Sequence, residues 1–462
     1  MLHYEIIDAF KTKDIFNQRI AFELPLNHSN PESHIIQVVI NITQKYSDHI
    51  SKLDAFETIA LPEEPKLIAY LQGGPGFPCA TPTSNSSVTK LLLDKNYQIL
   101  WLDQRGTGYS TPIQSKNFRE VVNNVYGDSE LNNQLRYILS FRADSVVKDL
   151  EMIRKFLIKD EKLSIIGQSY GGFCCFTYLS LYPKSLKEVL VTGGIPPIGF
   201  AVDDVYEATY KQTSERNWHY YNKFPQDRTK IVSICKYLKH RNTSLPNGSH
   251  LTPERFLQLG LNFGATGGTD TIHLLVTKLY EELKVLGQPT YNTLNTISQS
   301  LGFETNVIYA VFQEAIYCNG VGSKSNWSAD FLRESKFEIN DDEIYFTGEM
   351  VYKFMYENNS YSELAEFKDL AHALHEYTNW SNLYDVDVLK NISWKDVPIV
   401  AATYVNDQYV DFNLCKQVKE KYFAKDNLKQ YITSEFFHNG LRADPDKVLG
   451  SLFDLLENND ID

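Results

Sequence analysis

The chain has 462 residues, of which 43% are hydrophobic and 22% are charged, a composition typical of a globular protein with a large core. Its 45 Lys and Arg residues against 58 Asp and Glu residues give a net charge of −13, which argues against nucleic acid or an anionic membrane as the main partner. We find neither a signal peptide nor an apolar run long enough to cross a bilayer. The six cysteines form no C-x-x-C pair, so we expect reduced thiols and a cytoplasmic location.

The first part of the chain predicts strands at the edge of a sheet and then inside it. Residues 35–43 alternate and are rich in β-branched side chains, which indicates antiparallel strands. Residues 66–71 and 97–102 are short apolar runs typical of buried strands, and a helix is expected between them at 87–95. The first of these two strands runs directly into a glycine-rich loop.

The pattern then alternates regularly between helix and strand. Apolar residues recur at helical spacing over 144–155, and apolar runs at 163–166 and 186–192 predict two further strands. Strands that alternate with helices in this way predict a parallel sheet with right-handed crossovers.

A long interruption follows, because residues 200–392 show helical patterns rich in aromatic side chains and broken by polar loops. We interpret it as a mainly helical insertion over the sheet. The α/β pattern resumes with a strand at 397–404, a helix at 412–422, a strand at 428–433 and a closing helix at 444–456.

The sequence around Ser169 fits a nucleophile elbow. Gly167-Gln-Ser-Tyr-Gly171 matches the pattern G-x-S-x-G directly after a predicted strand. The glycines allow a tight turn from strand to helix, which lifts the serine hydroxyl above the sheet edge where a base can reach it. We therefore predict that Ser169 is a nucleophile.

A serine hydroxyl needs a base and an acid to become reactive. In α/β-hydrolases these follow the serine in the order acid, then histidine. Of the 11 histidines, His438 follows the last predicted strand. Asp407 follows the strand that resumes after the insertion and is our choice for the acid, with Asp411 as the competitor.

The oxyanion that forms during acyl transfer needs backbone N–H donors. One is expected from Tyr170, which follows the nucleophile. The other is expected from the loop after the strand at 66–71, where bare backbone can approach the substrate. Gly74 is our choice and Gly73 is the alternative.

Four motifs in order carry a resemblance to a known family: Gln72-Gly-Gly-Pro-Gly76, Asp103-Gln-Arg-Gly-Thr-Gly-Tyr-Ser110, Gly167-Gln-Ser-Tyr-Gly-Gly172 and His438-Asn-Gly440. Together they resemble the proline iminopeptidase (prolyl aminopeptidase) family of α/β-hydrolases, in its larger subclass. Many members carry His where this chain has Gln72, a difference that does not touch the oxyanion backbone. The expected fold is an α/β-hydrolase core, residues 1–198 and 394–462, with a helical cap at 199–393.

The resemblance implies removal of an N-terminal proline from peptides, with the free amine held by carboxylates of the cap. Glu314 and Glu349 lie in segments that resemble those cap motifs, and Phe346 and Tyr352 are expected to line an apolar slot for the proline ring. No cofactor and no metal are implied, since no H-E-x-x-H motif occurs.

The prediction from sequence is therefore a serine aminopeptidase that acts on peptides with a free N-terminal proline. Two alternatives stay open: an esterase or amidase with the same machinery and no need for a free amine, and an inactive hydrolase fold used for binding. We also expect Asp103 and Arg105 to form a buried ion pair that braces the neighbouring loops.

Overall fold

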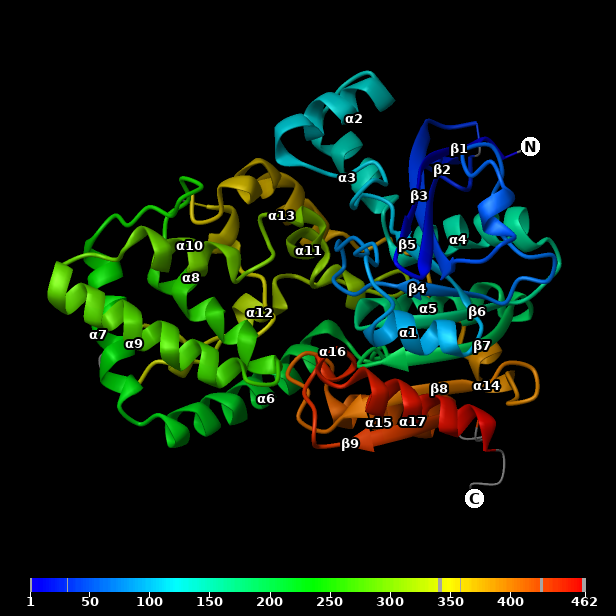
Figure 1. Cartoon of the computed structure of the whole chain (residues 1–462). Helices are drawn as coiled ribbons and strands as arrows, with labels where there is room; N and C mark the ends of the chain where they lie inside the picture. The colour runs from blue at the N-terminus through cyan, green and yellow to red at the C-terminus, as the bar shows by residue number, and fades with distance from the viewer. Residues whose placement is uncertain (1, 31, 340–342, 358, 424–426, 459–462) are drawn as a thin grey trace.

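The computed structural model describes residues 2–30, 32–339, 343–357, 359–423 and 427–458. Within them the chain forms a nine-stranded sheet with helices on both faces and a helical insertion to one side (Figure 1). The strands are β1 (Tyr4–Thr12), β2 (Ile15–Pro25), β3 (Ile35–Lys45), β4 (Leu67–Leu71), β5 (Gln98–Asp103), β6 (Leu163–Gln168), β7 (Leu186–Thr192), β8 (Ile399–Tyr404) and β9 (Leu428–Thr433).

The sheet confirms the predicted fold class. Its strand order is β1-β2-β3-β5-β4-β6-β7-β8-β9, with antiparallel pairing from β1 through β3 to β5 and parallel pairing from β5 to β9. The parallel strands all end at the same edge, so the loops that follow β4, β6, β7, β8 and β9 meet there.

The central strands are buried on both faces, which explains their unbroken apolar runs. In β6, Ile165 packs into the cluster that contains α4 (Ala143–Ile158) and α5 (Tyr170–Leu181). Its neighbour Ile166 packs into the cluster that contains side chains of α1 (Ser87–Asp94) and α17 (Pro445–Glu457). Successive side chains therefore anchor helices on opposite faces of the sheet.

Four further helices among the described residues complete the core on the two sides of the insertion, and the one at 412–422 matches the helix predicted after β8. They are α2 (Phe118–Tyr126), α3 (Leu131–Leu139), α15 (Phe412–Tyr422) and α16 (Gly440–Ala443). None of the described helices is both long enough and apolar enough to pass through a membrane.

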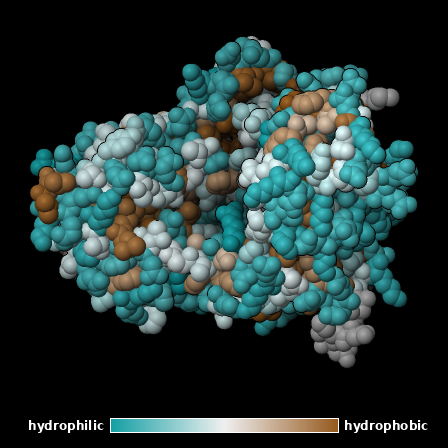
Figure 2. Space-filling view, in the orientation of Figure 1, coloured by the Kyte–Doolittle hydropathy of each residue, from teal (hydrophilic) through white to brown (hydrophobic). Residues whose placement is uncertain are grey.

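The insertion between β7 and β8 is helical, as predicted, with short 3₁₀ turns and loops between its helices. These are α6 (Val202–Lys223), α7 (Asp227–His240), α8 (Pro253–Leu257), α9 (Gly268–Leu286), α10 (Tyr291–Gln299), α11 (Val307–Phe312), α12 (Ser328–Phe331), α13 (Lys368–Glu376) and α14 (Val386–Asn391). The last of them, α14, packs on α5 and α15 of the core. Figure 2 shows the surface hollowed where the insertion meets the core.

The expected ion pair between Asp103 and Arg105 is wrong. The buried Arg105 guanidinium instead pairs with Asp149 of α4, through Nε at 2.7 Å and Nη2 at 2.5 Å. Asp103 accepts hydrogen bonds from the backbone N–H groups of Cys79 and Tyr109, both at 2.9 Å. Arg105 therefore braces the loop after β5 against a helix, and Asp103 fixes the loop itself.

Gly171 tests how closely α5 approaches the sheet. A Cβ added there would lie 1.9 Å from the carbonyl oxygen of Leu71, at the end of β4. We expect Gly171→Ala to lower the free energy of unfolding by about 1–3 kcal/mol, because helix and strand must move apart. Gly450→Ala is the matched control inside α17, where an added Cβ meets nothing within 4 Å. It should raise stability by up to about 1 kcal/mol. Unfolding midpoints measure both, and equal effects would contradict the close approach.

Candidate active site

Ser169 occupies the sharp turn between β6 and α5. Its backbone angles, φ 55° and ψ −125°, lie in a region that residues other than glycine rarely adopt. The turn is held by two hydrogen bonds, from Ser169 N–H to the Thr192 carbonyl at 3.0 Å and from Gly172 N–H to the Ser169 carbonyl at 2.7 Å. This strained geometry is that of a nucleophile elbow.

Glycines surround the turn because backbone packs against backbone there. A Cβ on Gly167 would lie 2.3 Å from the Gly171 carbonyl oxygen, and one on Gly194 would lie 2.3 Å from the Ser169 carbonyl oxygen. The sequence of the motif follows from these contacts, since any side chain would push the serine out of place.

Asp407 and His438 come together after β8 and β9. Asp407 Oδ2 lies 2.8 Å from His438 Nδ1, and both side chains are buried. The other oxygen, Oδ1, accepts the backbone N–H groups of Tyr409 at 2.8 Å and Val410 at 3.0 Å. Asp411, the competing acid, caps α15 by accepting the Leu414 N–H at 2.9 Å. The structure thus brings Asp407, not Asp411, to the histidine.

The environment of His438 favours a base with a fixed orientation. Burial lowers the pKa of its imidazole, but the carboxylates of Asp407 and Glu349 together raise it more, so the pKa lies above its usual value. With Asp407 ionised, Nδ1 donates its proton to that carboxylate and Nε2 is left as the acceptor.

Ser169 and the Asp407–His438 pair lie side by side. A Cβ added to Gly193 would come within 3.3 Å of His438 Nδ1 and 3.4 Å of Asp407 Oδ2, while the next residue, Gly194, touches the Ser169 backbone. Ser169 and His438 also line one pocket of about 260 Å³. Three residues far apart in sequence therefore converge above the carboxyl edge of the parallel strands.

The glycine-rich loop after β4 lies against Ser169. Gly73 and Gly74 both line the pocket, and a Cβ on Gly73 would meet Ser169 Cβ at 2.9 Å. Gly74 has φ 126°, a conformation open to glycine. Tyr170 is the first residue of α5, so its backbone N–H has no acceptor within the helix. Gly74 thus lines the pocket and Tyr170 directly follows Ser169, and the role of their N–H groups stays a prediction.

Glu349 is the charged residue that the insertion brings to this pocket. It lines the same cavity as Ser169 and His438, and its Oε1 accepts the Tyr309 hydroxyl at 2.6 Å. Burial raises the pKa of Glu349 to about 7, although His438 and the hydrogen bonds from Tyr309 and Gln313 oppose the rise. A carboxylate in this position can hold a cation beside the nucleophile.

Glu314 has other partners. Its two oxygens accept the backbone N–H groups of Ser328 at 3.1 Å and Ala329 at 3.0 Å, at the start of α12, and Oε2 lies 3.1 Å from His375 Nδ1. Glu314 is not among the residues that line the pocket.

Phe346 and Tyr352 are not brought to the pocket either. Phe346 is fully buried in the insertion, where its ring contacts those of Phe256 and Phe263. Tyr352 is fully buried too, and its hydroxyl lies 3.1 Å from that of Tyr210. Both side chains belong to the core of the insertion.

Other aromatic residues line the pocket instead, and the sequence analysis did not single them out as lining residues. Tyr309 stacks on Phe303 with ring centroids 4.8 Å apart and meets Phe77 edge-on at 5.0 Å. Tyr409 stands edge-on to the His438 ring at 4.7 Å. The sequence could have predicted that Tyr409 lines the pocket, since it lies two residues after Asp407. Nothing in the sequence distinguishes Tyr309 from the other aromatics of the insertion.

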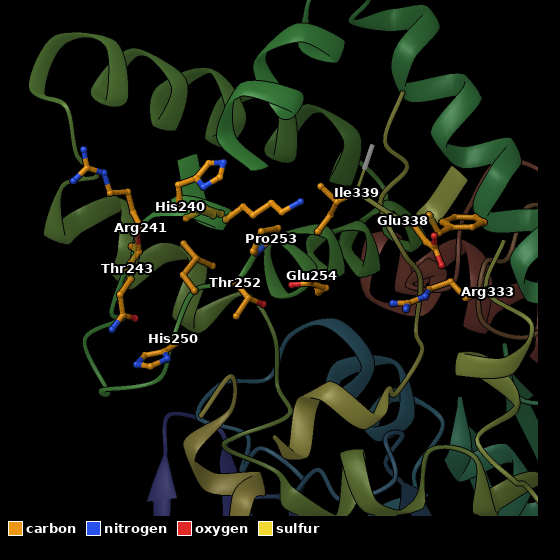
Figure 3. A pocket seen from close by; sticks show the side chains of 15 residues that line it. His240, Arg241, Thr243, His250, Thr252, Pro253, Glu254, Arg333, Glu338 and Ile339 are labelled. Carbon is orange, nitrogen blue, oxygen red and sulfur yellow. The ribbon is translucent and has the colours of Figure 1, made fainter. Parts of the chain in front are cut away.

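A larger hollow lies within the insertion, between α7, α8 and the segment around Arg333 (Figure 3). None of the residues predicted for the active site lines it. Its basic side chains, among them Arg241 and Arg333, stand far apart in the view and do not converge on one point. Within the described part of the chain, no group of three or more His, Cys, Asp or Glu residues is placed to hold a metal ion.

Comparison with known proteins agrees with this architecture. Residues 66–242 match the family described as alpha/beta hydrolase fold. The chain is 34% identical over 458 residues to a protein of Aeromonas sobria named proline iminopeptidase, covering 98% of each chain. It is 35% identical over 445 residues to proline iminopeptidase aneH of Aspergillus aculeatus, covering 94% of this chain and 92% of that one.

Such identity along nearly the whole length extends beyond the four motifs to the insertion and the sheet edges. Together with the elbow at Ser169 and the paired Asp407 and His438, it leads to one assignment: this chain belongs to the proline iminopeptidase family.

Proposed function

We propose that this protein is a serine aminopeptidase that releases an N-terminal proline from peptides through an acyl-enzyme. One observation carries the proposal: a half-buried carboxylate, Glu349, shares a small pocket with Ser169 and with His438, which is paired to Asp407. The nucleophile and its base provide acyl transfer, and the carboxylate provides a reason to select a free amine.

The reaction begins when Ser169 Oγ attacks the carbonyl carbon of the N-terminal proline and His438 Nε2 takes the hydroxyl proton. The negative charge that develops on the carbonyl oxygen is stabilised by the backbone N–H groups of Tyr170 and Gly74. The C–N bond then breaks, and His438 gives the proton to the leaving nitrogen. Water attacks the prolyl ester with the help of His438, which frees proline and restores Ser169.

Glu349 would anchor the proline amine. The amine nitrogen and the scissile carbonyl share one carbon, so an anchor must lie within a few ångströms of the nucleophile, as a residue of the same pocket does. A bound peptide covers this half-buried carboxylate, and covering it without a cation costs free energy, so a peptide with a blocked amine is disfavoured. The pocket is small, and its aromatic walls, Phe77 and Tyr309, suit a compact ring.

Glu314 stays a second candidate anchor, because Tyr206 and Tyr317 are within electrostatic reach of both glutamates. Burial raises the pKa of Tyr206 and of Tyr317, and the nearby carboxylates of both Glu314 and Glu349 raise each of them further. Its bonds to the start of α12 give it a structural role in any case.

The nucleophile can be tested directly. A fluorophosphonate probe should label the wild-type protein at Ser169, and Ser169→Ala should abolish labelling and lower kcat on a prolyl anilide by at least about 10⁴-fold. Ser180→Ala is a matched control on the same helix, α5. Mass spectrometry of the labelled peptide identifies the site. Labelling that survives Ser169→Ala would remove the proposed mechanism, and no labelling at all would favour the inactive binding fold.

The amine anchor can be tested with a prolyl anilide and its N-acetylated form. Wild type should strongly prefer the free amine, and Glu349→Gln should lower kcat/KM for the free amine by about 10²-fold or more, because the charged partner is lost. Glu314→Gln should act mainly through the unfolding midpoint. A loss of preference in Glu314→Gln as well would make it a second anchor. Equal cleavage of both compounds by wild type would favour the esterase or amidase alternative.

The acid limb of the pH profile should involve two groups. His438 must be neutral and Glu349 ionised, so both must lose a proton. Glu349 loses its proton as pH rises through about 7, where burial has placed its pKa, and the pKa of His438 is raised above its usual value. The slope of log kcat/KM against pH should therefore exceed one below this range in wild type, and fall to one in Glu349→Gln. Tyr309→Phe removes a bond that lowers the pKa of Glu349, so it should move the limb to higher pH. A slope of one in wild type would contradict the involvement of both His438 and Glu349 in the acid limb.

A further inference from the structure

The pocket at Ser169 has a basic side as well as an acidic one. Arg442 lies on α16, the short helix that follows His438, and lines the same pocket as Ser169 and Glu349. His438 is within electrostatic reach of both charges, since its pKa is raised by Glu349 and lowered by Arg442 in addition to the effects of burial and Asp407. The imidazole therefore has a carboxylate from the insertion and a guanidinium from the core as neighbours.

Arg442 is exposed and available to a ligand. In the parts of the chain that the structure describes, no carboxylate pairs with its guanidinium and no side chain or carbonyl accepts a hydrogen bond from it. Other arginines of this acidic chain do have acidic partners, in the pairs Arg19–Asp8, Arg105–Asp149, Arg119–Glu366, Arg154–Glu151, Arg228–Glu343 and Arg255–Glu304. An arginine without such a partner at the mouth of a pocket is suited to an anionic group of the substrate.

The chemistry of acyl transfer indicates which part of a substrate would meet it. His438 gives its proton to the leaving nitrogen, so the residue that follows proline must lie beside the imidazole. Arg442 lines the same pocket as the imidazole. In a dipeptide, the terminal carboxylate carbon is only two bonds from that nitrogen, within the span of an arginine side chain.

We propose that Arg442 binds a carboxylate on the residue that follows proline, which makes dipeptides with a free C-terminus preferred substrates. This proposal rests on the proposed aminopeptidase function. The pocket then holds a short peptide by both ends, with the amine on Glu349 and the carboxylate on Arg442, and the scissile bond between them above Ser169. An acidic side chain at the same position would offer the same chemistry.

The experiment compares kcat/KM for Pro-Ala and for Pro-Ala-amide, which lacks the terminal charge. Wild type should prefer the free acid by about five- to tenfold, the range of a charge-assisted hydrogen bond at a partly solvated site. Arg442→Gln should bring this ratio close to one, and Arg442→Lys should keep part of it. Lys416→Gln removes the same charge from an exposed position on α15 and should keep the wild-type ratio.

Two further substrates separate the possible outcomes. Pro-Asp-amide carries its carboxylate on the side chain, so an Arg442-dependent preference for it over Pro-Ala-amide extends the site to acidic side chains, and no such preference assigns it to the C-terminal carboxylate. A ratio near one in wild type, or a ratio unchanged in Arg442→Gln, overturns the proposal. A prolyl anilide serves as the reference. If wild type cleaves neither this anilide nor Pro-Ala nor Pro-Ala-amide, the proposed aminopeptidase function itself is wrong.

Discussion

The structure depends on one steric constraint, which is that backbone meets backbone around the turn at Ser169. The start of α5 is pressed against the end of β4 through Gly171 and against the loop after β7 through Gly172. Neither contact leaves room for a Cβ, so the serine cannot relax out of its strained conformation. Because the same loop after β7 also carries Gly193, which lies against Asp407 and His438, the constraint that fixes the nucleophile also sets its distance from the base.

The insertion adds to this rigid edge a half-buried carboxylate at the wall of the pocket. Glu349 is expensive to ionise where it lies, which is why its pKa is raised to about 7. A cation that enters the pocket recovers that cost, whereas a neutral group does not. In the proposed function, the core supplies the acyl-transfer chemistry and Arg442, and the insertion supplies the carboxylate that selects a free amine.

Much of the fold followed from the sequence, because apolar runs and helical spacing report burial directly. The strand β9 and the helix α15 have the predicted bounds, and a mainly helical insertion follows β7. Ser169, Asp407 and His438 could be chosen from motif and chain order alone, since a parallel sheet must bring the ends of its strands together. Their catalytic roles await experiment.

Side-chain direction was beyond the reach of the sequence. Phe346 and Tyr352 point into the insertion's own core, and nothing in their spacing distinguishes that from a pocket wall. Arg105 pairs with Asp149 rather than with its neighbour Asp103, because the loop after β5 turns the guanidinium toward α4. Side-chain partners that are set by tertiary packing cannot be predicted from the neighbouring sequence. The Tyr309–Glu349 hydrogen bond is a second example.

The contact between the glycine loop and α11 ties the two parts of the chain together. A Cβ on Gly76 would lie 2.8 Å from the Ile308 side chain and 2.9 Å from the Tyr309 backbone nitrogen, so the insertion rests directly on the loop that flanks the nucleophile. The insertion is therefore not structurally independent of the core. If the insertion were exchanged between homologues, by recombination or by engineering, the donor's loop after β4 would have to be exchanged with it. The two segments must therefore be inherited together.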